Sequence, residues 1–410
     1  MVMIEPEEAW QRVMAAVAPL APRRFALDGV AGRVLAEDVR AETDHPPFAA
    51  STVDGWAVVA EDPSPRRRIL SGEGGAGEMP TVTVVPGTAA RVMTGAPIPP
   101  GADAVVMVED SGVEGDFVHF TRAVHPGENV RPAGSDLAAG QVVLAAGTVL
   151  GPAEVGLLAT VGRFEVWAYP SPRVAVLSTG DEVVEPWETP GPAQIRDSNR
   201  YALMAAIREA GGEPVSLGII PDRPQALREK IETALDQADV LITSGGVSEG
   251  NRDHIGPLLA ELGTVHFNRV RQKPGKPFTF ATVRGKPCFA LPGNPVSALV
   301  SFELYVRPAL RRMAGHTRLR RPEMSVRLRH PVRPDPVRTE FVRAVVEQEE
   351  DGWWARTTGS QASSRLLSLL GANALLRIPP GPPLPEGATV TAILIAWPEE
   401  QNQPDGKPSG

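Results

Sequence analysis

Apolar residues recur along this chain with spacings that change from region to region. From Glu5 to about Leu20 they repeat at helical spacing, which predicts an amphipathic N-terminal helix. From about Ser51 to Leu150 the apolar runs are short and are separated by Gly and Pro turns, a pattern typical of β-strands. The clearest of these runs are 57–59, 104–108 and 142–144. This region is therefore predicted to be all-β.

Beyond Arg173 short apolar runs alternate with segments of helical spacing. Strands are predicted at 174–177, 215–220, 240–243, 264–270, 278–283 and 288–291. Helices are predicted over 201–210, after Asp222, after Asp253, and as one long helix over 296–313. Asp222 and Asp253 are expected to cap the second and third of these helices. The alternation predicts a doubly wound, mostly parallel α/β sheet with helices on both faces.

From Pro322 the short β-like runs return. They lie at 325–328, 341–346, 374–378 and 390–395 and predict a small C-terminal β-barrel or sandwich domain. The polar residues 399–410 are expected to form a disordered tail. Domain boundaries follow these changes of pattern: a β-rich domain over 49–138, the α/β domain over 172–318 and the C-terminal domain over 322–398.

Length and composition restrict the class of protein. A chain of 410 residues is longer than one hydrophobic core usually serves. The net charge of −8 disfavours a generic nucleic-acid binder, so an anionic ligand would need local partners. The single cysteine excludes a disulfide framework. No apolar run is long enough to span a membrane, and the N-terminus lacks signal-peptide features. We therefore expect a cytoplasmic protein.

Glycine and polar residues follow the predicted α/β strands, at the edge where open α/β sheets bind ligands. The Gly245–Gly246 pair lets backbone N–H groups approach a ligand, and Ser244 and Ser248 add hydroxyl donors, so this loop can cradle an anion. Asn251–Arg252 replace the residues that a P-loop requires, and an ordinary tight turn is the alternative. The residues expected to bind an anionic substrate at these strand ends are Thr179, Gly180, Ser244, Gly245, Gly246, Val247, Ser248, Pro292 and Asn294.

Charged residues gather at the same strand ends. Glu182, Asp222 and Asp253 would repel a bound phosphate unless a divalent cation lay between them, so Mg²⁺ is the simplest expected cofactor. The alternative is that Asp222 and Asp253 are only helix caps. Lys273 and Lys276 flank a stiff Pro-Gly turn that suits a tetrahedral oxyanion, although solvated lysines are the alternative.

Two further residues have plain structural interpretations when taken alone. Asp54 precedes a glycine and would ordinarily be a turn residue. Cys288 stands in an apolar run and is expected to be a buried core residue rather than a nucleophile.

Ordered segments of this chain resemble one family, the molybdopterin molybdenumtransferases or MoeA proteins, which also occur as the E domain of gephyrin. The segments run in the family's order from Pro46 to Leu370, so nearly the whole chain is covered. They are PPFAASTVDGWAV at Pro46, GSD at Gly134, LSTGDEV at Leu177, DSNR at Asp197, TSGGVSEG at Thr243, KPGKP at Lys273, LPGNPVSAL at Leu291, and RTEFVR with SSRLLSL near the C-terminus.

The resemblance implies an architecture and a function. It implies an elongated, four-domain chain whose central domain is molybdopterin-binding-like and whose residues 1–48 and 139–171 form a linker and dimerisation domain. It implies an enzyme that inserts molybdenum from molybdate into adenylylated molybdopterin, releasing AMP and forming molybdenum cofactor with the help of Mg²⁺. It further implies a homodimer that receives its pterin from a molybdopterin adenylyltransferase, without nucleic acid or membrane.

Matching segment to segment carries the family's functional residues onto this chain. The essential acidic residues and lysines fall on Asp54, Asp136, Glu182, Asp222, Asp253, Lys273 and Lys276. A metal would lie at Glu182, Asp222 and Asp253. The molybdate contacts fall on Lys276, Pro277, Ser297, Arg338 and one of Ser363 or Ser364. In the family, the residue matching Asp54 reaches the partner subunit's site.

The chain departs from the family's pattern at three positions, and two other functions remain open. Asn251 stands where a Glu is common, Arg269 where a Lys is common, and Trp56 where Tyr is usual. The α/β region also resembles CinA-like proteins that act on pyridine nucleotides, and a non-enzymatic scaffold like gephyrin is a further alternative. Retention of all five acidic positions favours the enzyme.

Overall fold

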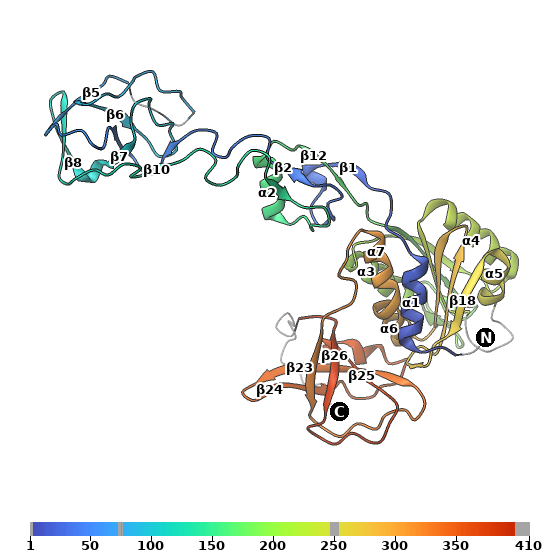
Figure 1. Cartoon of the computed structure of the whole chain (residues 1–410). Helices are drawn as coiled ribbons and strands as arrows, with labels where there is room; N and C mark the ends of the chain where they lie inside the picture. The colour runs from blue at the N-terminus through green and yellow to red at the C-terminus, as the bar shows by residue number, and fades with distance from the viewer. Residues whose placement is uncertain (1–2, 73–74, 76, 247–253, 398–410) are drawn as a thin grey trace. The chain divides into compact units, whose positions relative to one another are not determined.

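The chain forms two compact units, which are described separately (Figure 1). A computed structural model describes residues 3–72, 75, 77–246 and 254–397. Unit 1 comprises residues 1–25, 32–36 and 167–410, and unit 2 comprises residues 26–31 and 37–166. The chain passes between the units along β1 (Arg23–Ala26) and β12 (Glu165–Ala168). Within the described residues, no helix combines the length and apolar character needed to cross a membrane.

Unit 2 is built mainly from short strands, as the short apolar runs predicted. Its six-stranded sheet has the order β7-β4-β6-β5-β9-β8. The strands are β4 (Gly55–Val58), β5 (Arg67–Ile69), β6 (Thr88–Val92), β7 (Ala104–Met107), β8 (Ser111–Glu114) and β9 (Phe117–Phe120). Two ribbons pair β2 (Val39–Arg40) with β11 (Val142–Leu144), and β3 (Ala50–Ser51) with β10 (Val130–Arg131). The short helix α2 (Pro152–Thr160) was not predicted.

The central domain of unit 1 confirms the doubly wound α/β prediction. Its sheet has the order β16-β13-β17-β21-β20-β18. The strands are β13 (Arg173–Thr179), β16 (Glu213–Ile220), β17 (Val240–Ser244), β18 (Thr264–Arg269), β20 (Pro277–Val283) and β21 (Lys286–Leu291). β16, β13, β17 and β21 pair in parallel, while β20 is antiparallel to both of its neighbours. A small ribbon of β14 (Val183–Val184) and β15 (Ile195–Arg196) follows β13.

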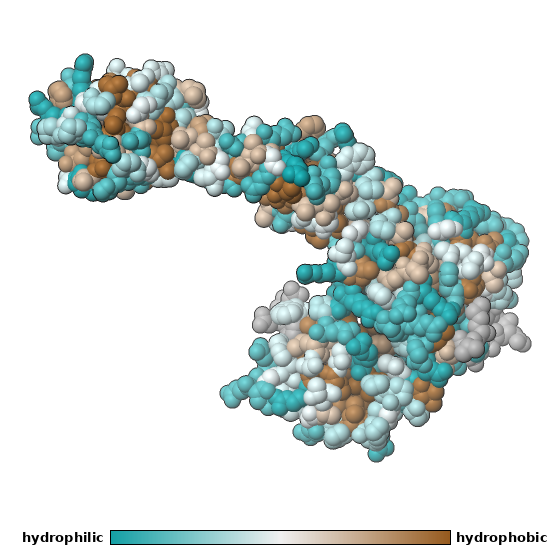
Figure 2. Space-filling view, viewed as in Figure 1, coloured by the Kyte–Doolittle hydropathy of each residue, from teal (hydrophilic) through white to brown (hydrophobic). Residues whose placement is uncertain are grey.

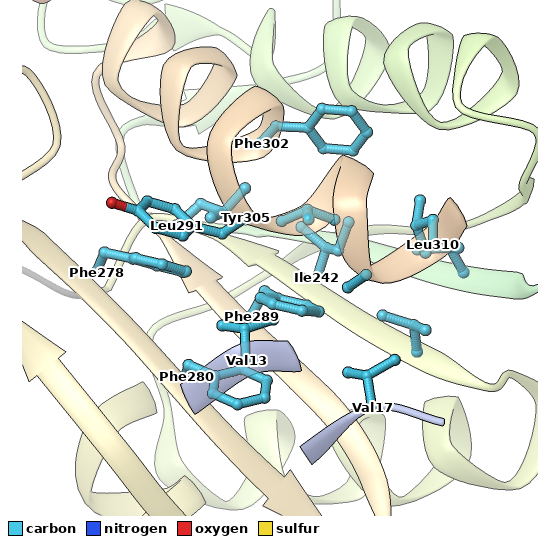
Figure 3. Close-up of a cluster of buried hydrophobic side chains, with 14 of the residues drawn as sticks. Val13, Val17, Ile242, Phe278, Phe280, Phe289, Leu291, Phe302, Tyr305 and Leu310 are labelled. Atoms are coloured by element: carbon cyan, nitrogen blue, oxygen red, sulfur yellow. The ribbon is translucent and has the colours of Figure 1, made fainter. Parts of the chain in front are cut away.

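Helices cover both faces of this sheet, so its strands are apolar on both sides. Val174 and Val176 face one core and Ala175 and Leu177 face the other, as the alternation along a strand requires. The first face carries α1 (Pro6–Ala16), α3 (Asn199–Glu209), α6 (Pro295–Ser301) and α7 (Arg307–Met313), and the second carries α4 (Pro224–Gln237) and α5 (Ile255–Leu262). Figure 3 shows the first core, in which α1, the sheet strands and the segment with Phe302 and Tyr305 all contribute side chains. In the view of Figure 2, hydrophilic and intermediate residues are interspersed with smaller hydrophobic patches.

The predicted long helix over 296–313 is interrupted, and the predicted first helix is shorter than expected. A π-helical segment at Phe302–Val306 separates α6 from α7. Pro308 in the first turn of α7 has no N–H and its ring excludes a regular helical bond to the preceding turn, so the π segment absorbs the mismatch. α1 ends at Ala16 because the backbone at Val17 is extended.

The C-terminal region of unit 1 confirms the β-barrel prediction. Its strands are β22 (Glu323–Leu328), β23 (Thr339–Glu349), β24 (Gly352–Thr357), β25 (Ala374–Ile378) and β26 (Thr389–Leu394), of which β24 was not predicted. The pairing of β23 with β25 closes the sheet into a barrel. One strand of the α/β domain, β19 (Gln272–Lys273), pairs in parallel with β23. The two domains of unit 1 are therefore joined by main-chain hydrogen bonds.

A buried ion pair in unit 2 should contribute strongly to its stability. Asp62 accepts hydrogen bonds from Arg67 Nε at 2.9 Å and from the Gly87 N–H at 2.7 Å, and both side chains are almost fully buried. Burial alone would raise the pKa of Asp62, but hydrogen bonds from Ser64, Gly87 and Arg67 outweigh it and hold the pKa well below its usual range. We expect Asp62→Asn to lower the free energy of unfolding of unit 2 by about 3–5 kcal/mol, because it leaves Arg67 buried without a countercharge.

The control for this prediction is Asp110→Asn, which removes a more exposed partner of Arg122 and should cost less than about 1 kcal/mol. Urea denaturation, read by hydrogen exchange of the β4 and β6 amides, measures both variants. The Asp62 contribution is present above about pH 4 and is lost as the pH falls through the lowered pKa. Equal losses in the two variants would contradict the prediction.

Candidate functional site at the carboxyl ends of the parallel strands

The chain leaves β13 in one direction to form β16 and returns to the other side of β13 to form β17. Ligands of open α/β sheets bind at such a change of direction, beyond the carboxyl ends of the strands. A cleft of about 670 Å³ lies there. The cleft brings together many residues selected from the sequence, namely Thr179, Gly180, Glu182, Asp222, Ser244, Gly245, Gly246, Pro277, Pro292, Asn294 and Ser364.

Glycines permit the close approach of the loops around the cleft. Gly245 has a φ of +95°, and a Cβ there would stand 2.5 Å from the carbonyl oxygen of Thr179. Gly246 has a φ of +67°, again in the left-handed region. The Gly245 N–H donates to the carbonyl of Leu291 at 3.1 Å, so this amide joins β17 to β21 instead of facing a ligand. Val247, Ser248, Asn251 and Asp253 lie outside the described residues.

Asn199 ties two walls of the cleft together, and the residue-by-residue argument from sequence did not select it. Its Nδ2 donates to Ser244 Oγ at 2.8 Å and to the Gly293 carbonyl at 2.7 Å. It belongs to the DSNR segment, which entered the family match without a role. Next to it, Arg200 is buried and bonds to Asp197, Glu185 and Ser216, which fixes the start of α3.

The expected helix-capping role of Asp222 is wrong. Arg223 occupies the N-cap position of α4, and no side chain caps that helix. Asp222 instead accepts a hydrogen bond from the hydroxyl of Thr179, and its N–H donates to Asp181 Oδ1 at 3.4 Å. The side chain of Asp222 is therefore directed to the end of β13, where Glu182 lines the same cleft.

Ser178 adds a polar atom to the end of β13. Its side chain is 2% exposed and lines the cleft, and its Oγ has no hydrogen-bond partner within the described residues. A buried hydroxyl without a partner is costly, so a ligand or water in the cleft is the expected partner. Sequence reasoning missed this residue because serine is common at strand ends.

The KPGKP turn carries the two predicted lysines, and a buried glutamine holds it through a hydrogen bond. Gln272 is fully buried, and its Nε2 donates to the Pro274 carbonyl at 3.1 Å while its Oε1 accepts from Tyr305 at 2.5 Å. Lys273 Nζ lies 2.6 Å from Glu340 Oε1, so this ammonium group is not simply solvated. Pro277, at the end of the turn, lines the cleft.

The N-terminus of α6 approaches the SSRLLSL segment. The Val296 N–H donates to the carbonyl of Ser363 at 3.1 Å, so one of the helix N–H groups expected to face an anion already has a partner. Ser297 in the same turn is buried, with 4% exposure. Ser364, but not Ser363, lines the cleft, which distinguishes the two serines.

The remaining predicted residues lie elsewhere. Asp54 and Asp136 belong to unit 2, whereas the cleft belongs to unit 1. Asp54 Oδ1 accepts from both the N–H and the hydroxyl of Thr94, which hold the pKa of Asp54 below its usual value. Asp136 pairs with Arg131. Arg338 pairs with Asp335, and Lys276 belongs to the KPGKP turn.

Cys288 is the buried core residue that the sequence predicted. It is fully buried on the β21 side facing α4 and α5, and burial raises the pKa of its thiol to about 12.

Comparisons with known proteins agree with this architecture from end to end. Residues 4–162 match the family described as MoeA N-terminal region (domain I and II), residues 175–312 match the probable molybdopterin binding domain, and residues 325–395 match the MoeA C-terminal region (domain IV). The chain belongs to the MoeA family. The CinA-like alternative leaves the first and third of these matches unexplained.

Curated MoeA relatives include proteins named molybdopterin molybdenumtransferase. One from Nostoc sp. is 38% identical over 85% of this chain and 83% of its own length. Another, numbered 1, from Mycobacterium tuberculosis is 36% identical over 92% of this chain and 95% of its own. Gephyrin from Dictyostelium discoideum is 37% identical over 89% of this chain, which spans 58% of that protein.

A solved MoeA structure shows the same fold. The molybdopterin biosynthesis MoeA protein from Pyrococcus horikoshii superposes with a TM-score of 0.83 at 33% identity, covering 97% of this chain and all of that one. A second structure of the MoeA protein from this organism gives a TM-score of 0.78 at 29% identity.

Substituting Gly245 should distort the cleft of this MoeA protein. We expect Gly245→Ala to lower the free energy of unfolding by well over the roughly 1–2 kcal/mol that left-handed strain alone costs, because its Cβ would overlap the Thr179 carbonyl. Gly285→Ala is the matched control, since its φ is +74° but nothing lies within 4 Å of the added Cβ. Urea denaturation with hydrogen exchange over 178–182 compares them. Similar effects of both changes would show that the close approach at Thr179 is unimportant.

Proposed function

We propose that this chain is a molybdopterin molybdenumtransferase, which inserts molybdenum from molybdate into adenylylated molybdopterin, releases AMP and forms molybdenum cofactor. One observation carries the proposal: the family matches together span residues 4–162, 175–312 and 325–395, and the family segments that follow the parallel strands converge on one cleft. The bacterial relatives from Nostoc sp. and Mycobacterium tuberculosis both carry the name molybdopterin molybdenumtransferase.

The cleft suits a large anionic substrate. Its volume of about 670 Å³ lies within the usual range for a small-molecule site. Polar groups converge on it from the strand ends, including the Ser178 hydroxyl at the end of β13, and the Asn199-bound Ser244 and the main chain around Gly246 at the end of β17. These groups bind and orient the phosphate-bearing part of the substrate, because hydroxyl and amide dipoles select a bound anion without adding net charge.

Glu182 and Asp222 are the residues that would hold Mg²⁺. Both line the cleft, and Mg²⁺ is usually bound by one or two carboxylates together with substrate phosphate oxygens and water. Within the described residues no group of three acidic, histidine or cysteine side chains could hold a metal ion by itself. When bound, the cation would neutralise phosphate charge beside the two carboxylates. The third proposed ligand, Asp253, lies outside the described residues.

The oxyanion is proposed to bind beside the KPGKP turn. Pro277 and Ser364 line the cleft where the α/β domain approaches the barrel, and Lys276 and Ser297 belong to the adjoining turn and helix. Arg338 supplies a planar guanidinium from the segment before β23. We also propose that Asp54 and Asp136 serve the reaction in a homodimer that takes its pterin from a molybdopterin adenylyltransferase. Light scattering of the purified chain tests the dimer.

Release of AMP from adenylylated molybdopterin tests the function. The purified chain should release AMP only with molybdate and Mg²⁺ present. Asp222→Asn should lower the rate at least about 100-fold, since a Mg²⁺ site that loses one of its carboxylate ligands loses several kcal/mol of stabilisation. The control Asp236→Asn removes an exposed carboxylate that pairs with Arg284 on the surface, and it should retain the wild-type rate.

The alternatives predict other results. A scaffold would release no AMP under any condition, and a CinA-like enzyme would consume a pyridine nucleotide instead. Full activity of Asp222→Asn would remove the metal role proposed for that residue while leaving the reaction itself in place.

The two serines of the SSRLLSL segment should differ in their effect on molybdate. We expect Ser364→Ala to raise the molybdate concentration for half-maximal AMP release about 10- to 100-fold, because a hydrogen bond to a charged group contributes about 1.5–3 kcal/mol. Ser363→Ala should change it less than about twofold, since the observed contact of Ser363 is its main-chain carbonyl with Val296. The reverse order of effects would reassign the oxyanion contact to Ser363.

A further inference from the structure

A carboxylate that the sequence did not single out lies beside the proposed oxyanion site. Asp335 precedes β23, and its side chain is only 9% exposed. Its Oδ1 accepts hydrogen bonds from the N–H groups of Val337 and Arg338, each at 3.0 Å. Its own N–H donates to Glu340 Oε2 at 3.1 Å. The turn therefore fixes this carboxylate through the main chain, independently of any partner that its second oxygen finds.

The second oxygen of Asp335 faces the guanidinium of Arg338. Asp335 Oδ2 accepts from Arg338 Nη2 at 2.6 Å and from Nε at 3.2 Å. The pair binds along one edge of the guanidinium, whose five N–H donors are arranged in a rigid plane. Within the part of the chain that the structure describes, Arg338 bonds through this one edge, so the N–H groups of the opposite edge can bind a second acceptor. Arg338 lowers the pKa of Asp335 to about 2, so the carboxylate is ionised at neutral pH.

A second carboxylate, that of Glu340, pairs with Lys273 of the KPGKP turn. Lys273 Nζ lies 2.6 Å from Glu340 Oε1 and 3.9 Å from Asp335 Oδ2. The parallel pairing of β19 with β23 sets Lys273 opposite Glu340 in the sheet. Two cations from different domains are thus held by two carboxylates, Asp335 before β23 and Glu340 within it, and Pro277 of the KPGKP turn lines the cleft.

Asp335 has two opposing effects on an anion bound at Arg338. Its charge repels the anion, but Arg338 is 31% exposed, so water and salt screen that repulsion. Its hydrogen bonds also hold the Arg338 side chain in one rotamer before the anion binds, so less rotamer freedom is lost on binding. Since the carboxylate is fixed by the main chain and occupies only one edge of the guanidinium, the orienting effect should be the larger.

We propose that Asp335 is a positioning residue, which fixes the guanidinium of Arg338 so that its other edge binds the tetrahedral oxyanion. The inference rests on the proposed function and extends it, because it adds to the oxyanion site a residue outside the set carried over from the family. The same arrangement would make the site selective, because an oriented, planar pair of donors favours an oxyanion with two acceptor oxygens over a monovalent ion such as chloride.

Asp335→Asn tests the proposal with little change to the turn. The asparagine oxygen can still accept the N–H groups of Val337 and Arg338, while an amide NH₂ replaces the oxygen that faces the guanidinium. Asp335→Ser is the second variant, since it keeps a small acceptor but places no amide donor against Arg338. Asp351→Asn is the matched control in the same barrel, because it removes an exposed partner of Arg327. Circular dichroism and urea midpoints verify that each variant is folded.

Two measurements are made on each variant. In the AMP-release assay, Asp335→Asn and Asp335→Ser should raise the molybdate concentration for half-maximal rate about tenfold, with a maximal rate within about twofold of wild type. The double variant Asp335→Asn/Arg338→Ala should be no worse than Arg338→Ala alone, since both changes remove one function. Equilibrium dialysis with molybdate alone should show the same order of affinities without any turnover.

The outcomes separate this inference from the proposed function. If the wild type binds molybdate in dialysis but releases no AMP, the proposed function fails while the comparison of Asp335 variants still decides the inference. The inference is overturned if Asp335→Asn binds molybdate as well as or better than the wild type, if its effect multiplies with that of Arg338→Ala, or if Asp351→Asn has an equal effect. Absence of molybdate binding to the wild type also overturns it.

Discussion

Strand β13 is buried on both faces and pairs in parallel with both β16 and β17, and this pairing sets the position of the cleft. Parallel strands end at the same edge of a sheet, so the loops after β13, β16, β17 and β21 converge although they are far apart in sequence. The apolar alternation of Val174 to Leu177 toward two cores fixes the register, because a shift of one residue would exchange the faces. The close contact of Gly245 with Thr179 then joins two of these loops.

The acidic and basic groups of the proposed site come from different parts of unit 1. Glu182 and Asp222 follow β13 and β16, and both line the cleft. The cations Lys273 and Arg338 come from the KPGKP turn and from the segment before the barrel strand β23, and they pair with Glu340 of β23 and with Asp335, respectively. In the proposed reaction, the phosphate-bearing pterin would bind beside the carboxylates and molybdate beside the cations.

The contact between the α/β domain and the barrel determines the position of the KPGKP turn. The main-chain pairing of β19 with β23 fixes the turn from one side, and the buried side chain of Gln272 fixes it from the other through Tyr305 and the Pro274 carbonyl. Tyr305 belongs to the π-helical segment, which places its hydroxyl toward the turn. The irregular helix thus has a structural role next to the site, as π segments often do.

The sequence by itself determined the order and type of most elements, because periodicity reports burial within a single segment. It predicted the α/β class, the strands at the sheet core, the C-terminal barrel and the buried Cys288, and its strand-end rule selected Thr179, Glu182, Asp222 and Ser244 for the cleft. Only the tertiary structure decided which partner each polar group finds. Asp222 binds Thr179 instead of capping α4, Asn199 joins two loops, Ser364 reaches the cleft while Ser363 binds Val296, and Asp335 holds Arg338. These contacts depend on distances between residues that are remote in the chain, and no pattern within one segment encodes such distances.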